Sequence, residues 1–214
     1  MNLATSIRTN SLGLALFALI TAGAIAITQT LSRDAIAANR EEAAARALYQ
    51  IIPAARIDND LLRDTVTLPR APSVGSEGPL TIHLARKAGE VIAVIVPVVA
   101  PDGYTGNIEL IVGIEADGSL AGVRVLNHQE TPGLGDKVDL KKSSWVLGFN
   151  GQQLEGDDDR SFAVKKDGGR FDQFTGATIT PRAVVGGVKR ALQLFHANRA
   201  HLLEGAPWEV HRNG

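Results

Sequence analysis

The chain has 214 residues, 44% of them apolar, and a formal net charge of -1 at pH 7. This length allows one globular domain of ordinary size beside a membrane anchor, but leaves little room for two full domains. The near-zero charge provides no basic field for nucleic acid and no acidic excess typical of disorder. The sequence contains no cysteine, which excludes disulfides, thiolate-bound zinc and cysteine-ligated iron–sulfur clusters. Any redox chemistry must therefore use an organic cofactor or a metal site without thiolates.

The N-terminal segment predicts a transmembrane helix. Residues Thr9 to Ser32 carry no charge, and the 20 residues from Leu12 to Leu31 are rich in Leu, Ala and Ile. A helix of about 20 residues crosses roughly 30 Å of bilayer core. A cleaved signal peptide ending near Ala24-Ile25-Ala26 is the alternative, although the apolar run is long for one. Arg8 before the run and Arg33 after it leave the orientation undecided.

The residues after the anchor predict a stalk, a linker and then a sheet. Arg33 to Ile52 contains no Gly or Pro, so we expect the helix to continue or to restart. Asp58 to Pro79 contains three prolines and two glycines and predicts an irregular connection. Apolar and β-branched residues then predict strands at Leu80–Arg86, Glu90–Val99, Asn107–Ile114 and Ser119–Asn127. Asp117-Gly118 favours a hairpin, so these strands should form an antiparallel meander.

The last third of the chain predicts mixed elements and a closing helix. We expect a short helix at Lys137–Leu147, a polar loop at Gly151–Arg160 and a short strand at Ser161–Lys166. Thr180 is a good N-cap and Pro181 a good first residue for the closing helix. Its apolar positions are spaced by four, three and four residues, which is the period of one buried helical face: Val184, Val188, Ala191 and Phe195. The expected fold class is α+β, an antiparallel sheet with flanking helices, preceded by one N-terminal transmembrane helix.

The segment Asp172-Gln-Phe-Thr-Gly-Ala-Thr178 lies directly before the closing helix. A helix N-terminus offers unpaired N–H groups and the positive end of the macrodipole, which favours a phosphate near Thr178. Gly176 leaves room for a bulky group to approach the backbone. The residues alone allow two interpretations: a site at which the threonine hydroxyl is presented for covalent chemistry, and a hydroxyl-rich turn that only caps a helix.

Two motifs resemble those of a known family. Residues 172–178 follow the pattern D-x-x-T-G-A-T, and residues 128–137 follow H-x-E-T-P-G-L-G-x-K. The segment Gly103-Tyr-Thr-Gly106, Trp145 and Phe149 also stand in the expected places. The chain resembles the FMN-binding domain family, found in the G subunit of Rnf-type electron-transport complexes and the C subunit of the sodium-pumping NADH:quinone reductase. The resemblance spans most of the chain, including the single membrane anchor.

The resemblance implies that Thr178 carries FMN through a phosphoester bond. It also implies that other residues of the two motifs contribute to cofactor binding: Thr175, Gly176, Ala177, Thr180, His128, Glu130, Thr131, Pro132, Gly133, Leu134, Gly135 and Lys137.

Simpler roles remain open for several of these residues. Thr175 and Thr180 could cap the helix, His128 could satisfy a backbone group, and Lys137 could be solvated. For Asp172 the implied role is recognition by the flavin-attaching enzyme, and the alternative is an Asx-turn. The acidic run at residues 157–159 favours a solvated loop over a metal site. No catalytic residue or metal-ligand cluster stands out elsewhere in the sequence.

The resemblance implies a membrane-anchored flavoprotein subunit that relays electrons through covalent FMN within an Rnf-type ion-translocating oxidoreductase complex. Such a chain is an electron carrier rather than a stand-alone catalyst. Its implied partners are the other subunits and, during maturation, a flavin transferase that transfers FMN from FAD with loss of AMP. The implied location is the bacterial inner membrane, with the soluble domain on the periplasmic side. A flavin-free structural or assembly subunit and a freestanding flavoprotein are the alternatives.

The expected domain layout follows from these features. It comprises a short cytoplasmic N-terminus at 1–9, a transmembrane helix at 10–31, a helical stalk and linker at 32–78, a covalent FMN-binding domain at 79–205 and a C-terminal tail at 206–214.

Overall fold

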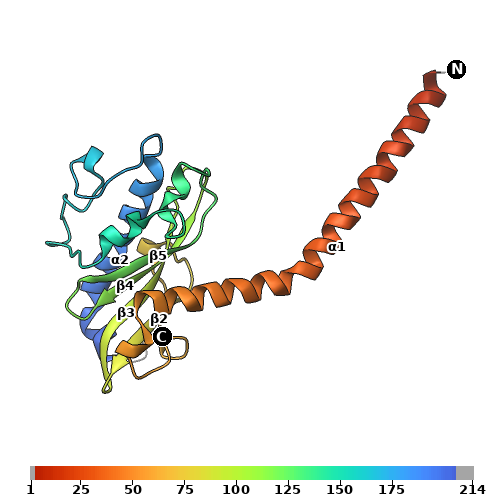
Figure 1. The fold of residues 1–214 in the computed structure, drawn as a ribbon. Helices are drawn as coiled ribbons and strands as arrows, with labels where there is room; N and C mark the ends of the chain where they lie inside the picture. Colours follow the sequence, from red (N-terminus) through yellow and green to blue (C-terminus); the bar gives the residue numbers. More distant parts are fainter. Residues whose placement is uncertain (1–2, 206–214) are drawn as a thin grey trace, which may run out of the picture. The chain divides into compact units, whose positions relative to one another are not determined.

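The computed structural model describes residues 3–205 (Figure 1). The chain forms two compact units, residues 1–43 and 44–214. The expected C-terminal tail and the first two residues of the expected N-terminal segment lie outside the described residues.

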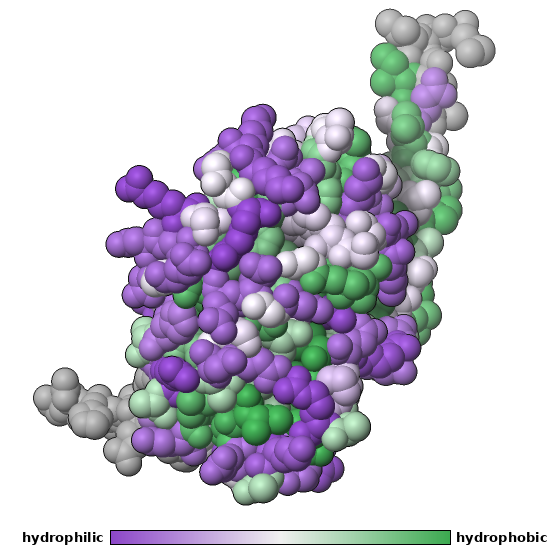
Figure 2. All heavy atoms as spheres, turned by 60° about the vertical axis from the view of Figure 1, so that its left-hand side comes forward, coloured by the Kyte–Doolittle hydropathy of each residue, from purple (hydrophilic) through white to green (hydrophobic). Residues whose placement is uncertain are grey.

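Helix α1 begins at Leu3 and ends at Ile51 without interruption, so the expected anchor and stalk belong to one continuous helix. From Asn10 onward it contains an 18-residue window with a mean hydropathy of 2.1, none of which is buried within the described structure. Figure 2 shows the contrast in polarity: hydrophilic side chains predominate on the visible face of the globular unit, whereas apolar side chains recur along α1. An exposed apolar helix is unstable in water, so α1 fits a single-pass membrane anchor.

The second unit is built on one five-stranded antiparallel sheet (Figure 1). Its strands follow in chain order: β1 (Thr65–Leu68), β2 (Leu80–Lys87), β3 (Glu90–Ala100), β4 (Ile108–Glu115) and β5 (Leu120–Asn127). The four predicted strands and their meander are confirmed. The sequence prediction missed β1, which pairs with the first half of β2 from Thr65 opposite His83 to Leu68 opposite Leu80. The run Thr-Val-Thr-Leu favours a strand, but its four residues are short and a proline follows at once.

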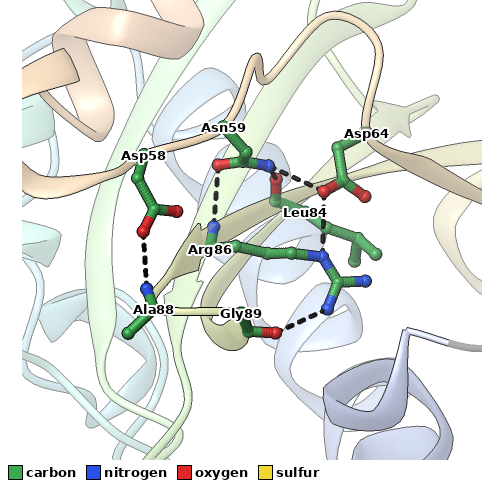
Figure 3. A network of polar contacts seen from close by, with 7 residues as sticks. All are labelled: Asp58, Asn59, Asp64, Leu84, Arg86, Ala88 and Gly89. Carbon is green, nitrogen blue, oxygen red and sulfur yellow. Dashed lines mark hydrogen bonds and ion pairs between the residues drawn. The ribbon is translucent and has the colours of Figure 1, made fainter.

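A polar network orders the residues that connect α1 to β1 (Figure 3). The Asn59 side chain donates to Leu84 O at 2.8 Å and to Asp64 Oδ2 at 2.9 Å, and its own oxygen accepts from Arg86 N at 2.9 Å. The Arg86 guanidinium donates to Asp64 Oδ2 at 2.9 Å. This connection is therefore irregular, as expected, but fixed to β2.

Helices cover both faces of the sheet. Helix α2 (Ile179–Glu204) packs on one face, and its four predicted apolar positions, Val184, Val188, Ala191 and Phe195, are fully buried. The last turn of α1, with Leu48 and Ile51, lies against Ile95 of β3 and Ile111 of β4 in a second cluster on the other face. A strand buried on both sides has a nearly continuous apolar sequence. This explains the run Val-Ile-Ala-Val-Ile-Val in β3.

Three local predictions are wrong, and in each case a side chain accounts for the difference. The helix expected at 137–147 is replaced by two short 3₁₀ helices, Gly135–Val138 and Ser144–Phe149. Between them Asp139 accepts hydrogen bonds from the backbone of the residues that follow it, and Ser143 caps the second 3₁₀ helix through Trp145 N at 3.2 Å. Local bonds of this kind compete with a helix.

The strand expected at Ser161–Lys166 is also absent from the described structure. The segment forms a single bridge between Val164 and Phe171 and then a 3₁₀ helix at Lys165–Asp167. Asp159 Oδ1 accepts from both the N–H and the hydroxyl of Ser161, which starts a turn instead of a strand. The polar loop expected at 151–160 contains neither helix nor strand in these described residues.

The N-terminal boundary of α2 differs from the prediction by two residues. Thr178, not Thr180, occupies the N-cap position, and Ile179 is the first helical residue. Pro181 therefore stands in the first turn, where its missing N–H still costs no hydrogen bond. The Thr180 hydroxyl donates to a carboxylate instead.

Candidate functional site

A tight turn delivers the chain to the start of α2. Ala177 N donates to Phe174 O at 3.1 Å, and Gly176 has φ +83°. A positive φ at the third position of a four-residue turn requires glycine or asparagine in most proteins, which accounts for Gly176. Thr178 then holds the N-cap position, yet its side chain makes no capping hydrogen bond to any described residue. The half-buried Thr178 hydroxyl is therefore left available at a helix N-terminus.

A cavity of about 320 Å³ opens beside this hydroxyl. Three chain segments line it: the loop after β3, the loop after β5 and the start of α2. The lining residues are Tyr104, Glu130, Thr131, Leu134, Gly135, Gly176, Ala177, Thr178, Ile179 and Thr180. The two sequence motifs, about 40 residues apart in the chain, thus meet at one cavity.

Most of the cofactor-binding residues implied by the resemblance line this cavity, but five of them do not. Thr175 is exposed in the turn, and Pro132 and Gly133 are exposed in their loop. His128 lies outside the lining and uses Nδ1 to accept from Glu130 N at 3.1 Å, which is the backbone role considered as its alternative. Lys137 is half-buried in the 3₁₀ helix Gly135–Val138, also outside the lining.

Two lining residues, Tyr104 and Ile179, were not among the expected site residues. Tyr104 is 66% exposed and Ile179 is 44% exposed, and Leu134 beside them is 42% exposed. These apolar side chains form the rim of the cavity. The Gly-Tyr-Thr-Gly segment of the sequence already pointed to Tyr104. Ile179 follows the D-x-x-T-G-A-T motif and gave no such signal, and its place in the cavity wall became clear only because α2 begins at this residue.

Glu130 connects the three segments that form the cavity. Its Oε1 accepts from the N–H and hydroxyl of Thr105, at 3.1 and 3.0 Å, and its Oε2 accepts from the hydroxyl of Thr180. Burial raises the pKa of the Glu130 carboxyl, but the hydrogen bonds from Thr180 and Thr105 outweigh it and hold the pKa below its ordinary value of 4.5. Glu130 is therefore a buried carboxylate that stays ionised at neutral pH.

Two glycines allow this close approach. A Cβ at Gly103 would lie 2.3 Å from Gly106 O and 2.9 Å from Glu130 Oε1. A Cβ at Gly135 would lie 2.7 Å from Thr180 Oγ1 and 2.9 Å from Glu130 Oε2. Any side chain at either position would force the carboxylate away from its partners.

Asp172, the first residue of the D-x-x-T-G-A-T motif, is held by a separate set of contacts. The Asp172 carbonyl accepts from Trp145 Nε1 at 2.7 Å, and its side chain lies 2.6 Å from Lys165 Nζ. The Trp145 ring packs edge-on against Phe149 and Phe174, with centroids 5.3 and 5.2 Å apart. The Asp172 side chain remains 68% exposed. It is thus accessible to another protein while its backbone is fixed.

One member of the acidic run at 157–159, Asp159, has a structural role. Asp159 accepts from Ser161 and forms an ion pair with Arg170 at 3.1 Å. The Arg170 guanidinium lies over the Phe162 ring, 4.9 Å from its centroid. Asp159 therefore anchors a loop on the core.

Comparison with known proteins agrees with this arrangement. Residues 103–193 match the FMN-binding domain family, and residues 1–51 match the RnfG N-terminal region family. The chain is 50% identical over 198 residues to the G subunit of the ion-translocating oxidoreductase complex of Shewanella loihica, covering 92% of this chain and 93% of that one. It is 48% identical to the G subunit of the same name from Pseudoalteromonas atlantica, and the match covers 89% of this chain and 88% of that one. It is also 48% identical to the G subunit from Vibrio cholerae, and that match covers 92% of this chain and 94% of the relative. The chain therefore belongs to the family of G subunits of Rnf-type ion-translocating oxidoreductase complexes and contains its FMN-binding domain.

Proposed function

We propose that this chain carries FMN as a phosphoester on Thr178 and relays electrons within its membrane complex. The observation that carries the proposal is the Thr178 hydroxyl itself. It borders the cavity formed by both family motifs, and it accepts no capping hydrogen bond from the backbone of the described residues. A threonine at an N-cap normally spends its hydroxyl on the helix, so this one is unusual.

The residues at the cavity fit a flavin nucleotide attached there. A volume of about 320 Å³ lies at the lower end of the range for small-molecule sites, and the apolar rim of Tyr104, Leu134 and Ile179 suits a flat aromatic ring. The N-terminus of α2 presents backbone N–H groups and a positive dipole end to a phosphate on Thr178. The neutral, glycine-containing turn at Gly176 leaves space for the attached group.

We propose that a separate flavin transferase makes the bond with FAD as the donor. The Thr178 oxygen forms a bond to the phosphorus of the FMN half, the pyrophosphate P–O bond breaks, and AMP leaves. The hydroxyl proton must go to a base, because a neutral threonine is a weak nucleophile. Glu130 is the carboxylate among the lining residues, and its oxygens are already occupied by Thr105 and Thr180. We therefore assign the base to the transferase, with Asp172 as part of its recognition surface.

The bound flavin would supply reversible uptake of electrons, and the chain's residues would position it and adjust its potential. A covalent tether prevents loss of the cofactor where free flavin is dilute. We propose that the globular unit lies on the periplasmic side of the bacterial inner membrane, with residues 1–9 in the cytoplasm. The name shared by the relatives supports a place in an ion-translocating complex. Protease treatment of spheroplasts tests the orientation, since an externally added protease should digest the globular unit.

The direct test compares the protein with Thr178→Val and Thr178→Ser variants, produced in a host that has the transferase. Valine is nearly isosteric with threonine but has no hydroxyl, whereas serine keeps the nucleophile. We expect flavin fluorescence in the denatured band of the wild type, its loss in the valine variant, and its retention at least in part in the serine variant.

Intact mass gives the second readout. The wild type should gain the mass of FMN less one water, located on the peptide that contains Thr178. A dark, unmodified wild type would favour the flavin-free structural or assembly function instead. A flavinylated chain that purifies from the membrane without any other subunit would favour a freestanding flavoprotein.

A further inference from the structure

Glu130 is a buried charge in the wall of the cavity. Its residue is only 4% exposed, and it lines the cavity together with Thr178 and Leu134. The partners of its carboxylate are the hydroxyls of Thr105 and Thr180 and a backbone N–H, all of them neutral. In the part of the chain that the structure describes, no ion pair joins Glu130 to a cation. Its negative charge is therefore stabilised by dipoles but not cancelled.

We infer that Glu130 is a positioning residue whose fixed negative charge lowers the reduction potential of the cofactor bound in this cavity. The inference rests on the proposed function, because it requires a flavin at Thr178. Electrons added to a group in the cavity place negative charge near the carboxylate, and water screens the repulsion less because the carboxylate is buried. A lower potential makes the site a better electron donor to the next carrier.

The geometry keeps the charge in place. Oε1 is held by Thr105 in the loop after β3, and Oε2 is held by Thr180 in the first turn of α2. A Cβ at Gly103 or Gly135 would lie 2.9 Å from one of the carboxylate oxygens, so glycine at both positions permits this arrangement. The hydrogen bonds also hold the pKa of Glu130 below 4.5, so the charge is present across the physiological pH range.

The decisive variant is Glu130→Gln, which keeps the size and shape of the side chain and removes its charge. The midpoint potential of the flavin is measured at pH 7 by spectroelectrochemical titration of full-length, flavinylated protein. We expect the variant to raise the ratio of reduced to oxidised flavin about tenfold at a given ambient potential, which is about 30 mV for a two-electron couple. Asp159→Asn is the matched control, since it removes a buried carboxylate outside the cavity lining, and its potential should equal the wild-type value.

Thr180→Val provides a second, independent variant. It keeps the charge but removes one hydrogen bond that lowers the pKa of Glu130, so that pKa should rise. In the wild type, the plot of midpoint potential against pH should therefore show a change of slope, here called the bend, below pH 4.5, where Glu130 takes up a proton. The bend should move to higher pH in Thr180→Val, and it should vanish in Glu130→Gln. A merely structural role for Glu130 predicts none of these shifts.

The outcomes separate the two proposals. If the wild type is flavinylated and Glu130→Gln has the same midpoint potential and the same pH profile, the inference is overturned but the proposed function is not. If Glu130→Gln fails to accumulate, an unshifted bend in Thr180→Val also overturns it. A wild type without covalent flavin overturns both the proposed function and the inference.

Discussion

Three threonine hydroxyls lie within six positions, and each has a different environment. Thr175 is exposed in the turn, Thr178 borders the cavity, and Thr180 is buried and donates to Glu130. Residue type cannot separate them, because any threonine can cap a helix or bind a phosphate. A carboxylate 50 positions earlier in the chain separates them, since it engages one hydroxyl and leaves its neighbour available.

Replacing Thr180 by valine should destabilise the globular unit. The change leaves Oε2 of a buried carboxylate without its donor, at a cost of roughly 1–3 kcal/mol. Chemical denaturation in detergent, followed by tryptophan fluorescence, measures the loss. Thr67→Val on the exposed face of β1 is the control and should change stability by less than about 0.5 kcal/mol. Equal stabilities for the two variants would contradict the role given to the hydrogen bond.

The contribution of Glu130 to stability should depend on pH. Its pKa is lower in the folded protein than its ordinary value of 4.5, so its stabilising effect is present above 4.5 and is lost as the pH falls through the lower folded value. We expect the difference in melting temperature between wild type and Glu130→Gln to be largest near neutral pH and to shrink below pH 4.5. Thermal melts at several pH values measure this, and a difference that grows on acidification would refute it.

At the scale of elements, the sheet depends on contacts made by two helices that are far apart in the sequence. Helix α2 covers one face, and the last turn of α1 covers the other. The backbone of β4 lies very close to α1, because a Cβ built at Gly113 would stand 2.3 Å from Ile51 Cγ2. Glycine is therefore needed here for close approach, not for a turn.

Gly113→Ala should lower stability by about 1–3 kcal/mol, since the added methyl group must displace Ile51 or the strand. Adding Ile51→Ala should remove part of that penalty, so the two changes together should cost less than their sum. The readout is the unfolding midpoint of each single and double variant. Gly148→Ala is the control, because a Cβ there meets no described atom within 4 Å. Strict additivity would mean that Ile51 does not set the constraint.

At the scale of the whole molecule, the two parts of helix α1 have apolar side chains in different environments. Its apolar part has exposed side chains such as Leu12, Phe17 and Leu31, whereas Leu48 and Ile51 near its end are buried against the sheet. The first set suits a lipid environment, and the second belongs to the core of the globular unit. The boundary between the two compact units falls within this helix, at residue 43.

Two truncations should therefore behave differently. Removing residues 1–43 should move the protein from the membrane to the soluble fraction with little change in its melting temperature. Removing residues 1–52 also strips Leu48, Ile51 and Ile52 from the sheet, each worth about 1.5–3 kcal/mol of burial, and should cause marked destabilisation or aggregation. Ultracentrifugation and thermal melts distinguish them, and equal stability of both truncated chains would contradict the packing role of α1.

The sequence by itself determined the features that depend on neighbouring residues. An uncharged apolar run indicated the anchor, apolar and β-branched residues indicated β2 to β5, and helical spacing indicated the buried face of α2. Two motifs with fixed spacing indicated the family. Each of these signals lies within a short window, where local geometry decides which side chains share a face.

Only the tertiary structure decided the features that depend on competition between distant groups. Strand β1 is too short to be predicted without its partner β2, and the helix expected near residue 140 gave way to turns that Asp139 and Ser143 stabilise. At the cavity, Glu130 joins its own loop after β5 to the loop after β3 and to the start of α2, and that contact engages the Thr180 hydroxyl, so Thr180 does not cap the helix. A buried hydroxyl without a hydrogen-bond partner costs free energy, and which acceptor lies within its reach is set by the fold.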